Sequence, residues 1–277
     1  MNQIVLRPPF SRLWAGLDPF VEVEALQGQV LRALEGRRTL RTEIDGRGYF
    51  AKIHRGVGWR EIFKNLTCLR LPVFGANNER QAIEHLERIG VDTMRMVAFG
   101  ERGRNPARRH SFIITEELAP TISLEDYCRD WPRTPPAPGL KRALIVRLAK
   151  IARSMHESWM NHRDFYLCHF LLHTDPPPTP ETFRLSIIDL HRAQIHAKAP
   201  APRWRRKDLA GLYFSALDIG LTRRDLLRFL RVYFNAPLRD TLRNQAELLT
   251  WLPREAARLA ERDRRKSAPA TTQDAAP

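Results

Sequence analysis

The sequence of 277 residues predicts an α+β fold of two lobes: a β-rich N-terminal lobe with one main helix, and an α-rich C-terminal lobe. Three observations support this prediction. Short apolar runs separated by turn residues follow one another up to residue 54, as in antiparallel strands. A single amphipathic helix is expected over 77–89, and apolar residues at helical spacing dominate after Leu118.

The N-terminal lobe is expected over residues 21–118, after an irregular lead-in over 1–20 that contains several prolines. Its strands are expected near 30–34, 39–44, 49–54, 94–101 and 110–118. Asp45-Gly46 separates the second strand from the third and predicts a tight hairpin. Asn77 or Asn78 is expected to cap the helix over 77–89, and Gly90 is expected to end it.

The C-terminal lobe is expected over residues 119–265. A helix is expected from 120–131, a long amphipathic helix over 140–158, a strand over 183–189, and mostly helix over 207–265. The remaining residues, 266–277, are polar and small and are expected to form a disordered tail.

The composition excludes several classes of protein. Hydrophobic residues make up 43% and charged residues 28%, which excludes a disordered chain, a collagen and a coiled-coil rod. The three cysteines, Cys68, Cys128 and Cys168, are too few and too scattered for a disulfide framework or a zinc site, so reduced thiols are expected. There is no signal-peptide pattern and no membrane-spanning run. We expect a cytoplasmic protein that reaches a membrane only from that side.

The chain is strongly basic. Lys plus Arg is 46 and Asp plus Glu is 31, giving a formal net charge of +15. Such a charge favours an anionic partner: nucleic acid, an anionic membrane, a phosphorylated sugar or an acidic protein. The basic runs at 102–109 and 203–207 suit either solvated surface or an anion-binding face. The basic segment 254–266 suits a solvated helix, a membrane surface or an acidic protein.

Two aspartates have the spacing of a phosphoryl-transfer site. His162-Arg163-Asp164 follows the long amphipathic helix, and Asp189 ends an apolar strand 25 residues later. In such a layout the first carboxylate orients the attacking hydroxyl, and the second holds Mg²⁺ on the phosphates. Few side chains are needed, because phosphoryl transfer depends mainly on positioning and charge neutralisation.

Residues 25–235 resemble the protein-kinase fold through six elements in the expected order: YFAKIH, NNERQAI, FIITEEL, HRDFYLCHFLLH, IIDLHR and WRRKDLAGLYFSA. The resemblance implies that Asp164 is the catalytic base and that Asp189 binds metal. It also implies that Lys52 contacts the phosphates of ATP and that Glu79 pairs with Lys52. The backbone of Glu116 and Leu118 is expected to meet adenine, and Asp208 is expected to steady the catalytic loop.

The sequence departs from protein kinases at two places. The phosphate loop, Glu35-Gly36-Arg37-Arg38, lacks the usual glycine pattern, and Arg37 and Arg38 would supplement its backbone N–H groups with charge. His169 stands where an Asn usually binds a second Mg²⁺. It would either ligate metal or order the loop through a hydrogen bond, since Mg²⁺ prefers oxygen.

A narrower resemblance explains the second departure. The catalytic loop with His169, the D-L-H-R motif at 189–192 and the run over 36–65 closely resemble the lipopolysaccharide core heptose kinases of the lipopolysaccharide kinase family. This resemblance implies transfer of the γ-phosphate of ATP, with Mg²⁺, to a hydroxyl of the first inner-core heptose. The reaction would take place on the cytoplasmic face of the Gram-negative inner membrane. Arg163 and Arg192 are candidates for contacting the acceptor.

Other functions stay open from the residues alone. The same fold could phosphorylate the neighbouring acidic sugar Kdo, a small molecule such as an aminoglycoside, or protein tyrosine. A nucleic-acid-binding protein would fit the pI of about 10.6, but no nucleic-acid-binding motif supports it, so no nucleic acid is expected. An acidic protein partner fits the charge, although no motif identifies one. A catalytically dead scaffold is disfavoured because Lys52, Asp164 and Asp189 are all present.

Overall fold

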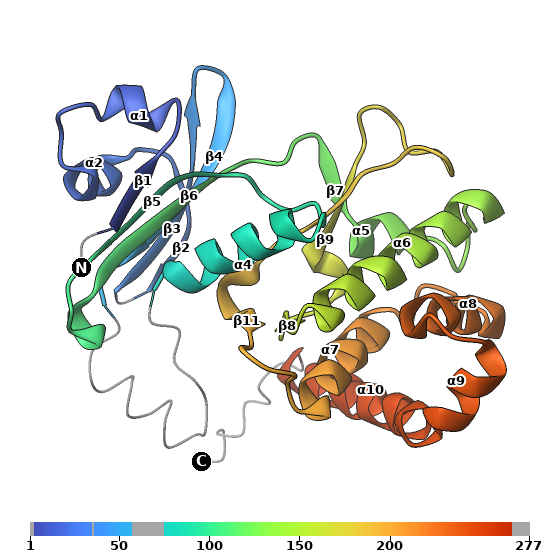
Figure 1. The fold of residues 1–277 in the computed structure, drawn as a ribbon. Helices are drawn as coiled ribbons and strands as arrows, with labels where there is room; N and C mark the ends of the chain where they lie inside the picture. The colour runs from blue at the N-terminus through green and yellow to red at the C-terminus, as the bar shows by residue number, and fades with distance from the viewer. Residues whose placement is uncertain (1–2, 35, 57–74, 268–277) are drawn as a thin grey trace, which may run out of the picture.

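A computed structural model describes residues 3–34, 36–56 and 75–267 and confirms the bilobal α+β fold (Figure 1). The N-lobe contains an antiparallel sheet with strand order β1-β5-β6-β4-β3-β2. Its strands are β1 (Gln3–Leu6), β2 (Gln29–Leu34), β3 (Arg37–Ile44), β4 (Arg47–His54), β5 (Met96–Arg102) and β6 (His110–Glu116). Glu35, Cys68 and residues 57–65 of the run described above lie outside the described residues.

The hairpin between β3 and β4 has the expected turn. Ile44 pairs with Arg47, so Asp45 and Gly46 form a two-residue loop, and both have positive φ (51° and 73°). Asp and Gly adopt this backbone conformation more readily than other residues, and its twist matches that of the flanking strands. The turn therefore sets the register that places Lys52 opposite Thr39.

The expectation of an irregular lead-in over residues 1–20 is wrong. β1 forms an edge of the sheet, and α1 (Phe10–Leu13) and α2 (Pro19–Ala25) lie against the face opposite α4 (Figure 1). Phe10, Trp14 and Phe20 are buried there against Phe112 and neighbouring strand residues. Burial of large aromatic side chains outweighs the local effect of the prolines. For the same reason residues 21–25, at the start of the predicted N-terminal lobe, are helical.

The main N-lobe helix, α4 (Asn77–Arg88), packs its apolar stripe of Ala82, Ile83 and Leu86 against the sheet and the C-lobe. Gly90 follows it with φ of 70°, as expected for the residue that ends a helix. The N-cap is Ala76 rather than Asn77 or Asn78, and no side chain caps the helix there. The asparagine side chains are therefore free to make other contacts.

The C-lobe is mostly helical, with α5 (Leu124–Cys128), α6 (Pro138–Glu157), α7 (Pro202–Ser215), α8 (Arg223–Phe234), α9 (Leu238–Asn244) and α10 (Ala246–Ser267). Its short strands are β7 (Thr121–Ser123), β8 (Met160–Asn161), β9 (Phe170–His173), β10 (Leu185–Ile187) and β11 (Gln194–Ile195). Residues 121–123, expected to be helical, instead pair with β9, and Ile122 packs there against the main core. The strand expected over 183–189 is shorter.

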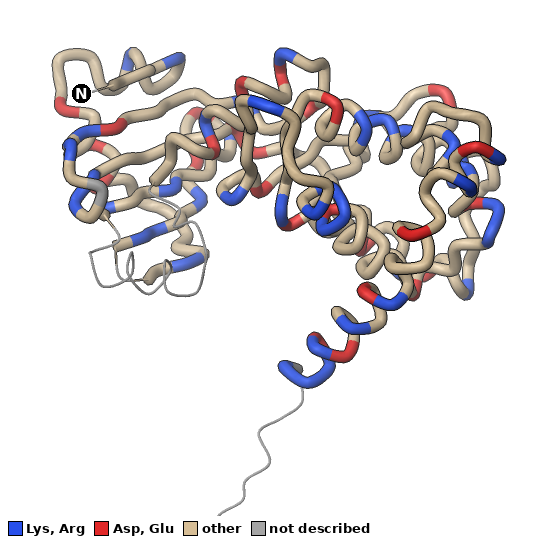
Figure 2. Tube along the Cα trace, turned by 60° about the horizontal axis from the view of Figure 1, so that its bottom comes forward, with Lys and Arg blue, Asp and Glu red and all other residues tan. Residues whose placement is uncertain are grey.

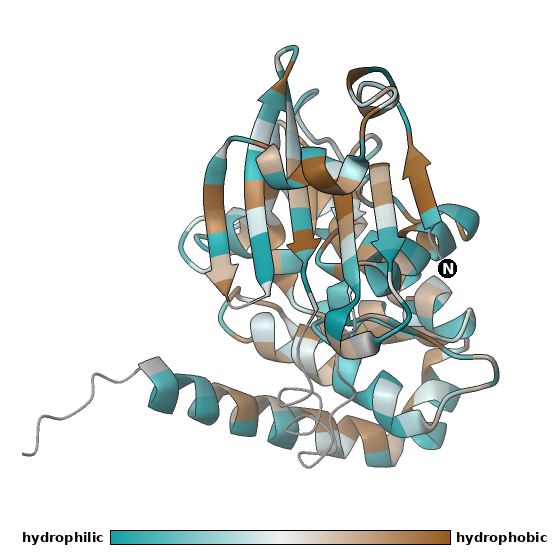
Figure 3. Cartoon of the chain, turned by 90° about the vertical axis from the view of Figure 1, so that its left-hand side faces the viewer, coloured by the Kyte–Doolittle hydropathy of each residue, from teal (hydrophilic) through white to brown (hydrophobic). Residues whose placement is uncertain are grey.

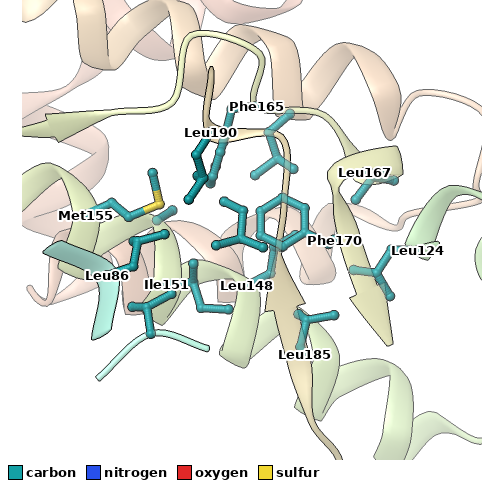
Figure 4. Close-up of a cluster of buried hydrophobic side chains, with 14 of the residues drawn as sticks. Leu86, Leu124, Leu148, Ile151, Met155, Phe165, Leu167, Phe170, Leu185 and Leu190 are labelled. Atoms are coloured by element: carbon teal, nitrogen blue, oxygen red, sulfur yellow. The ribbon is translucent and has the colours of Figure 1, made fainter. Parts of the chain in front are cut away.

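One apolar core joins the lobes beneath the catalytic segments. Met155 of α6 packs with Phe165, Phe170 and Leu190, and Leu86 of α4 joins them from the N-lobe (Figure 4). Each of these five side chains is at most 1% exposed. Because Phe165 and Leu190 directly follow Asp164 and Asp189 in sequence, this core fixes the backbone that carries both carboxylates.

The last helix, α10, extends beyond the rest of the C-lobe, with polar and charged residues along its projecting end (Figures 2 and 3). Lys266 and Ser267, expected in the tail, are its final residues, and 268–277 lie outside the described residues. Within the described ranges, no helix combines the length and hydropathy that crossing a bilayer requires.

Candidate active site

Lys52 and Glu79 form the ion pair that the sequence predicts. The Lys52 Nζ lies 2.7 Å from Glu79 Oε1, and the Glu79 side chain is only 2% exposed. Lys52 Nζ also lies 3.9 Å from Asp189 Oδ1. β4, α4 and the segment after β10 thus bring their charged groups to one point between the lobes. A lysine held in this way can contact phosphate oxygens.

The two arginines of the phosphate loop lie on opposite faces of β3. Arg37 pairs with His54, so it faces the same side as Lys52. Burial lowers the pKa of Arg37, and nearby Glu79 and Asp189 oppose that shift. Arg38 instead donates to the backbone carbonyls of Glu24 and Leu26, at 3.2 and 3.3 Å. Arg37 therefore lies on the Lys52 face of β3 and stays a candidate for phosphate contact, whereas Arg38 lies on the opposite face, since adjacent strand residues point to opposite faces.

His54 makes stability sensitive to pH. Burial lowers its pKa from 6.5 to about 3, and the positive charges of Arg37, Lys52 and His191 act in the same direction. In the unfolded chain His54 therefore binds a proton near pH 6.5, whereas in the folded chain it binds one only near pH 3. The contribution of His54 to stability should be full above pH 6.5 and fall as the pH drops towards 3. Between pH 7 and 5 we expect a loss of about 1–2 kcal/mol in urea unfolding. His54→Gln should flatten this slope, and an unchanged slope would contradict the assignment.

Asp208 of α7 organises the catalytic loop. Its carboxylate accepts hydrogen bonds from the backbone N–H groups of His162 and Arg163, both at 2.8 Å. The Asn161 amide and the His156 ring add bonds at 3.4 and 3.2 Å. Burial raises the pKa of Asp208, but hydrogen bonds and charge from His156 and His162 outweigh it, so the pKa is lowered. An ionised, fully bonded carboxylate thus holds the loop, as the resemblance implies.

Asp164 is held from two sides. Its Oδ1 accepts a bond from Arg192 Nη1 at 2.6 Å, and its backbone carbonyl accepts one from His169 Nδ1 at 2.6 Å. Arg163, the preceding residue, has a positive φ of 74°, which is unfavourable for a side chain of that type and is maintained by its bond to Asp208. The orientation of the Asp164 carboxylate is therefore fixed before any substrate arrives.

Asp189 and His169 could hold a metal ion together. Because His169 Nδ1 must donate to the Asp164 carbonyl, a neutral ring directs the lone pair of Nε2 outward, and Nε2 lies 3.5 Å from Asp189 Oδ2. Asp189 has a left-handed backbone (φ 61°), and its Oδ1 lies 2.5 Å from His191 Nδ1. Burial raises the pKa of Asp189, but His191 and then Lys52 and His169 outweigh it, so the pKa is lowered.

This donor set fits a magnesium ion that binds mainly to phosphates. Among the described residues no group of three or more His, Cys, Asp or Glu side chains forms a metal site. Mg²⁺ at nucleotide sites commonly has one or two protein ligands, with phosphates and water completing the octahedron. An ionised Asp189 with one imidazole is sufficient for that kind of site.

The two hinge residues lie where the lobes connect. Glu116 ends β6 opposite Tyr49, and its carboxylate lies 3.3 Å from Arg95 Nη1. Leu118 follows, packs against the main core, and accepts a bond from the Thr121 hydroxyl with its carbonyl, at 2.7 Å. Their backbone groups stay the expected contacts for adenine.

Asn78 is a site residue that the sequence interpretation missed. Its amide donates to the carbonyls of His191 and Ala193, at 2.8 and 2.7 Å. The amide thus ties the first turn of α4, which carries Glu79, to the segment that carries Asp189. The position directly before Glu79 was the available signal, but a capping role explained it equally well.

Removal of this amide should slow catalysis. In Asn78→Ala, two carbonyls lose their donor and α4 is free to shift from the 189–193 segment, so we expect kcat to fall about tenfold. Asn77→Ala is the matched control, because among the described residues the Asn77 side chain bonds to Arg80 of the same helix and to no other segment. Steady-state phosphoryl transfer measures both variants. Equal activity of the two variants would show that the amide link has no catalytic effect.

Comparison with known proteins agrees with this geometry. The model of the lipopolysaccharide kinase (Kdo/WaaP) family matches residues 21–233. A lipopolysaccharide core heptose(I) kinase WaaP of Pseudomonas aeruginosa is 63% identical over 95% of this chain and 98% of its own length. A protein of the same name from Escherichia coli is 55% identical over 95% and 99%.

A solved structure shows the same fold at high identity. It is described as WaaP in complex with acyl carrier protein and superposes with a TM-score of 0.83 at 59% identity. The match covers 93% of this chain and 99% of that one. From its sequence and its fold, the chain belongs to the lipopolysaccharide kinase (Kdo/WaaP) family and is an ATP-dependent phosphotransferase.

Proposed function

We propose that this enzyme transfers the γ-phosphate of ATP to a hydroxyl of the first heptose of the lipopolysaccharide inner core. The observation that supports this most is identity of 53–63% to core heptose(I) kinases over 95% of the chain. The intact pairs of Lys52 with Glu79 and of Asp164 with Arg192 add physical support. The reaction would take place at the cytoplasmic face of the inner membrane, where the basic surface would meet anionic lipid.

Each of these residues has a separate role in the proposed reaction. Lys52, oriented by Glu79, contacts the phosphates of ATP, and Arg37 adds positive charge from β3. Asp164 uses Oδ2, the oxygen that Arg192 does not bind, to accept the proton of the heptose hydroxyl as the new O–P bond forms. ADP leaves with the electrons of the broken bond. Asp189 and His169 would hold Mg²⁺, which neutralises phosphate charge when bound.

The test uses labelled ATP, Mg²⁺ and two acceptors: intact inner core, and core from which the heptose phosphate has been removed. Label entering only the dephosphorylated core would support the proposal. Label entering Kdo, the protein itself or water would still support the ATP site, but it would show that the acceptor is a different one. Absence of transfer from ATP to any acceptor would contradict it.

We also propose that an acidic carrier protein binds this chain, since the solved relative described above is a complex with acyl carrier protein. The net charge of +15 complements such a partner. A cavity of about 490 Å³ in the C-lobe is lined almost wholly by apolar side chains, among them Leu148, Leu209, Leu226, Phe229 and Leu252. A cavity of this kind suits an acyl chain, which leaves water most favourably in apolar surroundings.

Thermal unfolding tests the role of the cavity. An acylated carrier protein should raise Tm more than the same carrier without its acyl chain, because only the first fills the cavity. Ala216→Phe, at the cavity wall, should remove that difference, whereas the exposed Ala15→Phe should keep it. Equal shifts from both forms of the carrier would rule out acyl binding and leave only surface docking.

A further inference from the structure

Three cations converge on one indole ring beside the catalytic loop. The centroid of Trp204 lies 5.5 Å from Arg163 Cζ, 5.0 Å from Arg203 Cζ and 5.3 Å from Lys207 Nζ. Trp204 belongs to the first turn of α7, and Arg203 and Lys207 are exposed there. Each contact with the ring is favourable by itself, but the three charges repel one another.

Carboxylates lie near this cluster, among them Asp164, Asp208 and Glu255, but no described carboxylate forms an ion pair with its three cations. Within residues 3–34, 36–56 and 75–267, none of the three cations has a carboxylate within 4.0 Å. The nearby acids are used elsewhere: Asp208 holds the amides of the catalytic loop, and Glu255 pairs with Arg258 at 2.5 Å. An anion that binds here would therefore meet three cationic donors that already lie close together and form no ion pair with a described carboxylate.

The cluster adjoins the reacting group. Arg163 directly precedes Asp164, and its backbone N–H is fixed by Asp208 at 2.8 Å. Arg192 holds Asp164 at 2.6 Å, and its positive charge adds to the effect of burial in lowering the pKa of Arg163. A molecule that presents a hydroxyl to Asp164 would thus bring its neighbouring groups near Arg163.

We propose that Arg163, Arg203 and Lys207 form a subsite for an anionic group, a carboxylate or a phosphate, on the saccharide whose hydroxyl Asp164 receives. This inference rests on the proposed function, since it assigns a second contact to the same acceptor. The cations recognise the charge of the acceptor beside the reacting sugar, and the subsite sets its position relative to the base.

Acceptor kinetics with the full-length chain test the subsite. Arg203→Ala/Lys207→Ala should raise KM for the anionic acceptor about fivefold to twentyfold, and raise KM for ATP much less. Arg206→Ala is the matched control: it removes the same charge from the same helix, but Arg206 pairs with Glu247 at 2.9 Å. Two altered acceptors, one with carboxylates reduced to alcohols and one without phosphate, distinguish the anionic groups. The acceptor that lacks the recognised group should give the same KM with wild type and the double variant.

Two kinetic results would overturn the subsite: equal effects of the double variant and Arg206→Ala, or equal use of anionic and neutralised acceptors by wild type. Calorimetric binding of the anionic saccharide without ATP keeps this test separate from the reaction. Binding lost in the double variant supports the subsite even where heptose receives no phosphate. Transfer to heptose with unchanged acceptor binding overturns the subsite and keeps the reaction.

Discussion

Asp164→Asn should reduce kcat by about 10²–10⁴-fold. An amide cannot accept the hydroxyl proton as a carboxylate does, so the attacking oxygen would have to develop its charge without a base. The fold and ATP binding should be retained. The change is isosteric, the Lys52–Glu79 pair is untouched, and the backbone of residue 164 keeps its bond to His169. Single-turnover transfer from labelled ATP, measured with nucleotide-induced thermal shift, checks both parts.

Asp218→Asn is the control for Asp164→Asn, because Asp218 is an exposed carboxylate after α7 and should leave kcat unchanged. The pair also separates general loss of negative charge from loss of the base. If Asp164→Asn turned over at nearly the wild-type rate, the catalytic base would be another residue. The role of Asp164 would then be to bind Arg192.

Asp208→Asn should lower the free energy of unfolding by about 3 kcal/mol and also lower kcat. The Asp208 side chain is 1% exposed and accepts bonds from two backbone N–H groups, an amide and an imidazole. Asparagine would replace one acceptor oxygen by an NH₂ group directed at other donors. Because the lost bonds hold the backbone of His162 and Arg163, Asp164 should be misplaced as well.

Urea unfolding at pH 7 and at a pH well below 3.8 tests this assignment. The pKa of Asp208 is lowered in the folded chain, so its contribution is full above the ordinary value of 3.8 and is lost as the pH falls through the folded pKa. Asp208→Asn should therefore lose most stability, relative to wild type, at neutral pH. Glu247→Gln, an exposed carboxylate paired with Arg206, is the control and should change stability by less than about 0.5 kcal/mol. A loss no larger in Asp208→Asn than in this control would contradict the structural role.

Local chemistry determined much of the site in advance. Asp45-Gly46 fixes the β3–β4 hairpin by its backbone preference, and the hairpin register places Lys52 on a known face. Asp164 and Asp189 each adjoin apolar residues that must be buried, so their strands and loops could be located from pattern alone. His169 could be assigned to the catalytic loop for the same reason, although its role could not.

Long-range packing determined the rest. The Asn78 amide meets carbonyls more than a hundred positions away, and local sequence describes only a capping role for it. Arg37 and Arg38 are chemically alike, and only the register of β3 separates the one on the Lys52 face from the one on the α2 face. The segment of α1 and α2 is ordered because its aromatic residues are buried against one face of the sheet.

The sequence by itself determined the fold class, the order of the catalytic elements and the family, since these depend on residue types at fixed spacings. Only the tertiary structure decided which charges are neutralised. Arg206 and Arg203 are indistinguishable in the basic run over 203–207, yet one meets Glu247 and the other meets an indole beside two further cations. Charge pairing depends on distances between segments that the chain brings together only on folding.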